Sequence, residues 1–237
     1  MSAIEFWSFS LNGDDADLGS AEQLLSTPER TRAAAFRFDR HRRRFVIRRA
    51  MRRILLAHIA DIEPADLEFS ESDRGKPELI GANFEFNTSH TRDVGVIVTS
   101  NAPLGVDIEA IDRPMDYLKF AQRMFTDEEF LDISKARDDE LRIAFFNCWT
   151  GKEAYVKAIG QGLQKDLRSF SVECAPDSVP GLRWSVDNDS NAWRFERIAT
   201  DDHIVTIVAQ DSAGYAGVHE QALSTESLRA GMPVSMQ

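Results

Sequence analysis

The chain has 237 residues, enough for one large domain or two small ones, and its 43% hydrophobic and 28% charged content is ordinary for a soluble globular protein. No apolar run approaches the roughly 20 residues that a membrane span requires, which excludes an integral membrane protein. No basic segment leads into an apolar stretch at the N-terminus, so we expect no secretory signal and a cytoplasmic location.

The formal net charge of −11 conceals one basic segment. Between Glu29 and Arg53 there are eleven arginines and two acidic residues, a net +9, which leaves −20 for the rest of the chain. Such a segment can bind nucleic acid, a phosphate-rich small molecule or an acidic protein surface, or it can be a solvated helix face.

The first elements expected are a short strand over residues 6–11 and a helix that begins at Thr27 and Pro28. Apolar residues then follow the helical stagger from about residue 40 to 60, which predicts one amphipathic helix. Arg44, Arg48 and Arg52 recur at every fourth position of that helix and form a basic stripe beside its buried face.

Strands and two further helices are expected in the remainder. Alternation of apolar and polar residues predicts strands over 85–89, 94–99, 105–109, 170–173, 193–198 and 203–209. Helical patterns cover about 115–136 and 138–159, and Gly160 and Gly162 end the second. The tail after about residue 224 has few apolar residues and is expected to fray.

Helices and strands are mixed in each half without sustained βαβ repetition, which favours an α+β fold over a doubly wound sheet. The polar, proline-containing segment 100–104 is the best candidate for an internal boundary. We therefore expect an N-terminal half over 1–104 and a C-terminal half over 105–237.

Asp107 and Glu109 alternate with Val106 and Ile108 in the strand that begins at Gly105. On a strand this spacing puts both carboxylates on one face and both aliphatic side chains on the other. Two adjacent carboxylates repel each other unless a cation lies between them, and oxygen ligands suit Mg²⁺. An exposed strand face explains the pattern equally well.

A second group of polar residues lies on the helix predicted over 138–159. Trp149, Glu153 and Lys157 are spaced four apart and share a face, and Lys152 lies about 100° away from Glu153. One carboxylate and two ammonium groups could complete a metal site and neutralise phosphate. A routine surface ion pair is the simpler interpretation of these residues taken alone.

A third group consists of Gly75-Lys76-Pro77 and Phe86-Asn87-Thr88-Ser89-His90. Ser89 and His90 are neighbours in a strand, where successive side chains point to opposite faces, so they are a poor nucleophile pair and are better interpreted as separate ligand contacts. The chain has no dinucleotide fingerprint, Walker loop or His-Glu-x-x-His helix.

The order and spacing of these groups resemble the Sfp-type 4'-phosphopantetheinyl transferase superfamily. The family's strand signature stands here as Gly105-Val106-Asp107-Ile108-Glu109. Its helix signature stands some forty residues on, as Trp149-Thr150-Gly151-Lys152-Glu153-Ala154-Tyr155-Val156-Lys157-Ala158. The segments Gly75-Lys76-Pro77, Phe86-Asn87-Thr88-Ser89-His90 and Arg123-Met124-Phe125-Thr126-Asp127-Glu128-Glu129 also resemble family segments.

The resemblance implies two similar α+β halves related by a pseudo-two-fold, with coenzyme A and a metal ion in the cleft between them. It implies Mg²⁺ ligation by Asp107, Glu109 and Glu153. As a separate hypothesis, Glu153 and Lys157 are catalytic: Glu153 acts as the general base on the serine, because it is the carboxylate on the helix with the two lysines, and Lys157 adds charge or a proton at the leaving group. The positions that would contact coenzyme A are Arg44, Lys76, Ser89, His90, Lys152, Lys157 and, less securely because the spacing differs by one residue, Arg30.

The implied reaction is transfer of phosphopantetheine from coenzyme A to a serine of an apo-acyl or peptidyl carrier protein, by a monomer. Some of the basic stripe, Arg48 and Arg52 in particular, would then receive the acidic helix of the carrier. A Mg²⁺-dependent hydrolase would share the carboxylates. A nucleic-acid binder would use the arginines, but the −20 carried by the rest of the chain argues against it.

Overall fold

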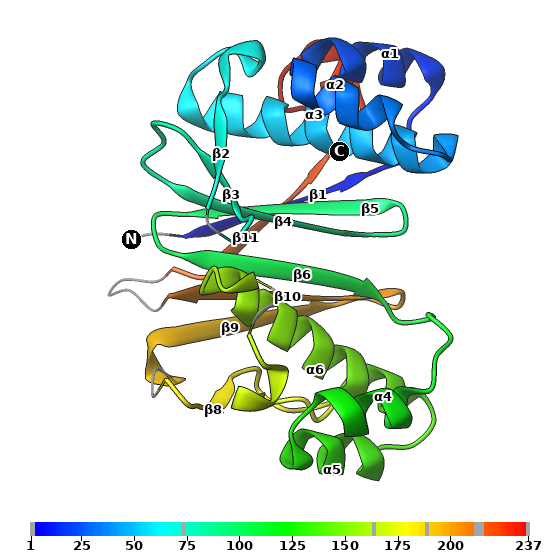
Figure 1. Cartoon of the computed structure of the whole chain (residues 1–237), viewed down its shortest axis with the longest axis vertical. Coiled ribbons are helices and arrows are strands. Elements are labelled where there is room, and N and C mark those ends of the chain that lie inside the picture. Colours follow the sequence, from blue (N-terminus) through cyan, green and yellow to red (C-terminus); the bar gives the residue numbers. More distant parts are fainter. Residues whose placement is uncertain (1–2, 73, 163–164, 188–189, 211–215, 236–237) are drawn as a thin grey trace.

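Two long helices lie on the outer sides of a pair of sheets that face each other (Figure 1). They are α3 (Asp39–Ala60) and α6 (Asp139–Ala158). The computed structural model describes residues 3–72, 74–162, 165–187, 190–210 and 216–235. No helix in these ranges is both long and apolar enough to cross a membrane.

The first half contains one four-stranded sheet, in the order β11-β1-β5-β4. Its strands are β1 (Ile4–Ser10), β4 (Glu85–Thr91), β5 (Val94–Ser100) and β11 (Val218–Leu223). Its helices are α1 (Asp15–Leu24), α2 (Thr27–Ala34) and α3. The small hairpin of β2 (Phe69–Glu71) and β3 (Pro77–Leu79) lies between α3 and β4 in the chain.

The second half contains a three-stranded sheet, in the order β6-β10-β9. Its strands are β6 (Leu104–Ala110), β9 (Trp193–Ala199) and β10 (His203–Gln210). Its helices are α4 (Tyr117–Met124), α5 (Asp127–Lys135) and α6, and a small hairpin joins β7 (Phe170–Val172) to β8 (Leu182–Ser185).

The two halves share one plan. Each begins with a strand, continues into a long helix and ends in an antiparallel hairpin whose second strand pairs with the first strand of the half: β1 with β5, and β6 with β10. The expectation of an α+β fold built from two similar halves is confirmed.

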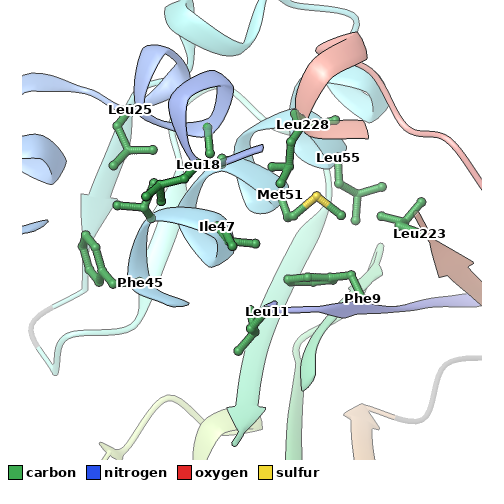
Figure 2. Close-up of a cluster of buried hydrophobic side chains, with 14 of the residues drawn as sticks. Phe9, Leu11, Leu18, Leu25, Phe45, Ile47, Met51, Leu55, Leu223 and Leu228 are labelled. Carbon is green, nitrogen blue, oxygen red and sulfur yellow. The ribbon is translucent and has the colours of Figure 1, made fainter. Parts of the chain in front are cut away.

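Three apolar layers hold this arrangement together. Met51 and Leu55 of α3 pack against Phe9 of β1 in the core of the first half (Figure 2). A middle layer between the sheets includes Val98 and Val106. The third layer, against α6, contains aromatic side chains from α4, the junction of α4 and α5, α6 and β7: Tyr117, Phe120, Phe125, Phe145, Phe146, Trp149, Tyr155 and Phe170.

The C-terminal segment corrects two of our expectations. We expected residues 105–237 to form the second half, but β11 pairs in parallel with β1 and so belongs to the first sheet. We expected the tail after about residue 224 to fray, but α7 (Glu226–Ala230) packs on the first half. Leu228 is buried in the α3 core, and Arg229 pairs with Asp14 and Asp17, so this segment is held by apolar and ionic contacts.

The region from 115 to 136 is also different from our expectation of one helix. It forms α4 and α5, separated at Phe125 and Thr126, because the Thr126 side chain accepts a hydrogen bond from the backbone N–H of Glu129 while the Glu129 carboxylate accepts one from the N–H of Thr126. A comparable cap starts α2 at Ser26, one residue before the expected Thr27.

Candidate active site

Asp107 and Glu109 lie on the face of β6 that α6 covers. Val106 and Ile108 alternate with them and are buried between the sheets, so the predicted separation of carboxylates from aliphatic side chains is confirmed. Gly105 lies on the same face as the carboxylates. A Cβ atom there would lie 2.2 Å from the Ala154 carbonyl oxygen, so β6 and the backbone of α6 are in direct contact.

Glu109 is held by two hydrogen-bond donors from different elements. Nε1 of Trp149 donates to Oε1 over 3.2 Å, and Oγ1 of Thr91 donates to Oε2 over 3.4 Å. Trp149 lies on α6 and Thr91 at the end of β4, so Glu109 lies where the two halves meet.

Lys157 joins the same site from two turns beyond Trp149 on α6. Its Nζ lies 2.7 Å from Oδ1 of Asp107, 3.2 Å from Oγ of Ser89 and 3.0 Å from the carbonyl oxygen of Val106. Ser89 in turn donates to Oδ1 of Asp107 over 2.9 Å. The structure therefore brings Ser89, Asp107 and Lys157 together, although they come from β4, β6 and α6.

Glu153 faces these residues from α6. Burial raises the pKa of Glu153, and the charges of Asp107 and Glu109 raise it further, while Lys157 lowers it. Burial and the charge of Asp107 likewise raise the pKa of Glu109. The charge of Asp107 therefore disfavours ionisation of both Glu109 and Glu153, and the cations nearby, Arg113 for Glu109 and Lys157 for Glu153, compensate only in part.

The chemistry of this donor set fits a hard cation. Oδ2 of Asp107 is buried and has no hydrogen-bond partner among the residues described, and all three carboxylates supply the oxygen ligands that Mg²⁺ prefers. As the side chains stand, no three histidine, cysteine, aspartate or glutamate residues within the described ranges converge closely enough to bind a metal ion.

Cationic side chains surround the ring of His90. The guanidinium of Arg48 lies 2.7 Å from its Nε2 atom. Burial within the protein, followed by the charges of Arg48, Lys157 and Arg44, lowers the pKa of His90 to about 4. Lys76 lies toward the other end of β4, where it contacts Glu85 and the carbonyl oxygen of Leu104.

Three hollows meet at Pro77. The first, of about 210 Å³, opens beside Lys157 and is lined by Arg74, Gly75, Lys76, Pro77, Asn87, Thr88, Lys157, Gly160 and Gly162. The second, of about 200 Å³, is lined by Arg48, Arg49, Arg52, Pro77, Thr88 and Ile97. The third, of about 620 Å³, continues between α2, α3 and the β2–β3 hairpin and includes Arg32, Arg49 and Arg52.

Several arginines of the basic segment pair with carboxylates of the first half. Arg52 and Arg53 are buried and pair with Glu29, and Arg43 pairs with Asp15. The expectation that Arg52 receives an acidic partner is therefore wrong, because its guanidinium fastens α2 to α3. Arg48 is directed to His90 rather than to open surface.

Two residues expected at the phosphates lie elsewhere. Lys152 is fully buried and pairs with Glu129 at 2.8 Å, on the side of α6 away from Glu153, so the expectation of a phosphate contact is wrong. Arg30 donates to the carbonyl oxygen of Leu25, just before α2, and to the hydroxyl of Thr27 at the start of α2, and it is absent from the linings of the three hollows.

Asn87 and Thr91 contribute to the site but were not singled out from the sequence. Oδ1 of Asn87 accepts the backbone N–H of Val106 over 3.0 Å and ties β4 to β6. Both residues share the period-two face of β4 with Ser89. That alternation was the available signal.

The low pKa of His90 leads to a measurable titration. We expect the His90 ring to titrate near pH 4 in the NMR spectrum of the free protein, and Arg48→Gln to move the midpoint toward the ordinary value of 6.5. Since the folded-state pKa is depressed, stability is lost as pH falls from about 6.5 toward 4, and His90→Asn should lose less over that range. A midpoint near 6.5 in the parent would contradict this description.

Comparison with known proteins follows the division into halves. Residues 103–208 match a family model described as the 4'-phosphopantetheinyl transferase superfamily, and residues 12–102 match one described as 4'-phosphopantetheinyl transferase, N-terminal. The chain is 30% identical over 218 residues to the 4'-phosphopantetheinyl transferase HetI of Nostoc sp., which covers 90% of this chain and 89% of the relative.

Two further likenesses cover less of the chain. The 4'-phosphopantetheinyl transferase psf-1 of Bacillus pumilus is 32% identical over 166 residues, 68% of this chain and 70% of the relative. A solved holo-(acyl-carrier-protein) synthase from Bacillus anthracis, in complex with CoA (3',5'-ADP), covers 47% of this chain and 97% of its own, with 23% identity and a TM-score of 0.38.

Proposed function

The chain belongs to the 4'-phosphopantetheinyl transferase superfamily, and we propose that it transfers the 4'-phosphopantetheine of coenzyme A to a serine of an apo-acyl or peptidyl carrier protein, with Mg²⁺. The observation that carries this proposal is the meeting of Asp107, Glu109, Glu153 and Lys157 at the junction of the two halves. A cleft with several carboxylates and a lysine suits the handling of a metal-bound pyrophosphate.

The protein's own groups account for most of the reaction. The serine hydroxyl attacks the β-phosphorus of coenzyme A, the pyrophosphate bond breaks, and 3',5'-adenosine bisphosphate leaves. Glu153 takes the serine proton, because it is the carboxylate of α6 that faces Asp107 and Lys157. Lys157 stabilises negative charge that builds on the leaving phosphate. Mg²⁺, held by Asp107, Glu109 and Glu153, would supply further positive charge to the pyrophosphate oxygens.

The nucleotide end of coenzyme A would lie along the hollows that meet at Pro77. Lys157 and Lys76 line the first hollow and supply charge for the pyrophosphate. Ser89 lies beside Lys157 on one face of β4. His90, Arg44 and Arg48 lie on the opposite face, and Arg48 lines the second hollow, so the 3'-phosphoadenosine would bind on the side of α3. Lys152 and Arg30 have no part in this arrangement.

Mass spectrometry of an apo-carrier after incubation with the protein, coenzyme A and Mg²⁺ tests the proposal. We expect the carrier to gain one phosphopantetheinyl group, and chelation of Mg²⁺ to prevent the gain. Release of phosphopantetheine to water without modification of the carrier would instead identify a hydrolase and refute the transfer.

Both sides of the proposed cleft come from one chain, which supports a monomer as the active form. Carriers of fatty-acid, polyketide or nonribosomal-peptide synthesis are the candidate partners. Comparing transfer rates to one purified carrier of each kind would identify the preferred one.

A further inference from the structure

Glu129 and Lys152 form an ion pair from which water is excluded. Both side chains are 0% exposed, and Nζ of Lys152 lies 2.8 Å from Oε1 of Glu129. The same ammonium group donates to the backbone carbonyl oxygens of Leu167 and Phe170, each over 2.7 Å. The three hydrogens of the ammonium therefore have three acceptors.

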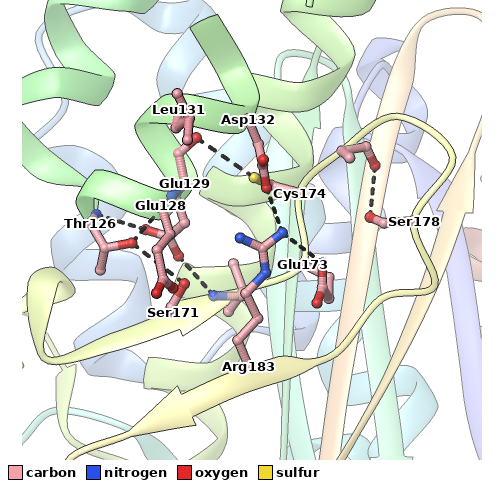
Figure 3. A network of polar contacts seen from close by, with 12 residues as sticks. Thr126, Glu128, Glu129, Leu131, Asp132, Ser171, Glu173, Cys174, Ser178 and Arg183 are labelled. Carbon is pink, nitrogen blue, oxygen red and sulfur yellow. Dashed lines mark hydrogen bonds and ion pairs between the residues drawn. The ribbon is translucent and has the colours of Figure 1, made fainter. Parts of the chain in front are cut away.

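The Glu129 carboxylate is equally well satisfied. Oε2 accepts the backbone N–H of Thr126 over 2.9 Å, and Oε1 accepts that of Val172 over 2.8 Å. Figure 3 shows Glu129 at the start of α5, between Thr126 and the strand that carries Ser171. The pair thus joins α5, α6, β7 and the segment that leads into β7.

Two residues that closely follow α6 form one wall of the first hollow. After α6 ends, Gly160 and Gly162 line the hollow opposite Arg74 and Lys76. A Cβ atom on Gly162 would lie 3.2 Å from the carbonyl oxygen of Arg74, so the two halves of the chain approach closely here. The backbone N–H of Lys165 donates to the carbonyl oxygen of Gly162, which connects this wall to the part that Lys152 holds.

A fully buried ion pair is not by itself a reason for high stability. Removing both charges from water costs about as much as their attraction returns, and an apolar pair of similar size can be as stable. The pair instead makes the packing specific. The two charged groups and their four backbone partners are all satisfied in one arrangement of α5, α6 and β7.

We propose that Glu129 and Lys152 are positioning residues that hold the wall of the first hollow at Gly160 and Gly162, and thereby set the affinity for a pyrophosphate-bearing substrate that neither residue touches. The identity of that substrate as coenzyme A rests on the proposed function. Lys152 acts through the backbone at Leu167 and Phe170, whereas its neighbour Glu153 faces the carboxylates on the other side of α6.

The test uses a double variant in which both members of the pair are neutral, so that an effect on substrate binding can be separated from an effect on stability. Lys152→Met alone leaves Glu129 buried without its partner, and we expect a large fall in Tm. Adding Glu129→Gln removes the uncompensated charge and should restore most of the Tm. If the pair positions the wall, the double variant still binds coenzyme A about tenfold more weakly by calorimetry and shows a similar rise in KM, with kcat nearly unchanged.

The outcomes distinguish this inference from the proposed function. A double variant with both its Tm and its coenzyme A affinity near the parent values would overturn the positioning role. Faster amide exchange at Leu167–Phe170 in the double variant, together with weaker binding, would support it. Since calorimetry measures binding without a carrier, a parent that binds coenzyme A but modifies no carrier would refute the transfer and leave the positioning role standing. Lys119→Met, on the exposed surface of α4, is the matched control and should change neither quantity.

Discussion

Gly105→Ala should slow transfer by about a hundredfold and destabilise the protein. The added Cβ atom would lie 2.2 Å from the carbonyl oxygen of Ala154 and 2.4 Å from the backbone nitrogen of Ala158, and these hydrogen-bonded backbone atoms near the end of α6 cannot move aside independently. β6 must therefore shift away from α6, which separates Asp107 from Lys157. A displacement of about 1 Å at such a site can cost about a hundredfold in rate, and overpacking costs about 1–3 kcal/mol.

Gly151→Ala is the matched control on the opposite element. Gly151 is also fully enclosed, but a Cβ atom there would lie 3.5 Å from Cγ2 of Val172, which is ordinary contact. Alanine is favoured over glycine inside a helix by roughly 1 kcal/mol. We expect Gly151→Ala to keep its activity and to unfold at a slightly higher temperature. Parent-like transfer by Gly105→Ala, measured beside this control, would contradict the close contact of β6 with α6.

Period-two and helical patterns predicted most of the elements that build the site. The alternation around Asp107 and Glu109 correctly placed both carboxylates on one face of β6, and the four-residue spacing of Trp149, Glu153 and Lys157 correctly placed them on one face of α6. Both predictions succeeded because they depend only on the geometry of a single element.

Predictions that depend on partners from other elements were less successful. Helical spacing placed Lys152 about 100° from Glu153, but nothing in that spacing reveals that Glu129, from another helix, lies on that side. The basic stripe was predicted as one surface, but Arg52 is buried and pairs with Glu29. In each case a carboxylate from another helix pairs with the cation, so the cation is not available to bind a ligand.

Two predictions about how the elements are arranged were wrong, one for a local reason and one for a non-local reason. The break between α4 and α5 was visible in the sequence as Thr126 followed three residues later by Glu129, a capping box inside an apparently continuous helical pattern. The return of β11 to β1 was not visible, because the partner of a short, half-polar strand is chosen by a sheet edge more than 200 residues away.

Glu153→Gln should reduce kcat for transfer by a factor of about 10³ at saturating Mg²⁺. The amide keeps the size of the side chain but cannot accept the serine proton, and it is a much weaker ligand for a hard cation. Because burial, Asp107 and Glu109 all raise the pKa of Glu153, its charge is held at a cost in the folded state. In chelator-treated protein the same variant should therefore unfold at a higher temperature than the parent.

Lower activity together with higher metal-free stability is expected only where neighbouring carboxylates disfavour the charge of the residue that is replaced. Glu140→Gln, in the exposed first turn of α6, is the matched control and should leave the transfer rate unchanged. Transfer by Glu153→Gln near the parent rate would remove both the ligand and the base role of Glu153. A fall in both rate and metal-free Tm would show that Glu153 stabilises the fold, and would leave Asp107, Glu109 and Lys157 as the groups from which the mechanism has to be rebuilt.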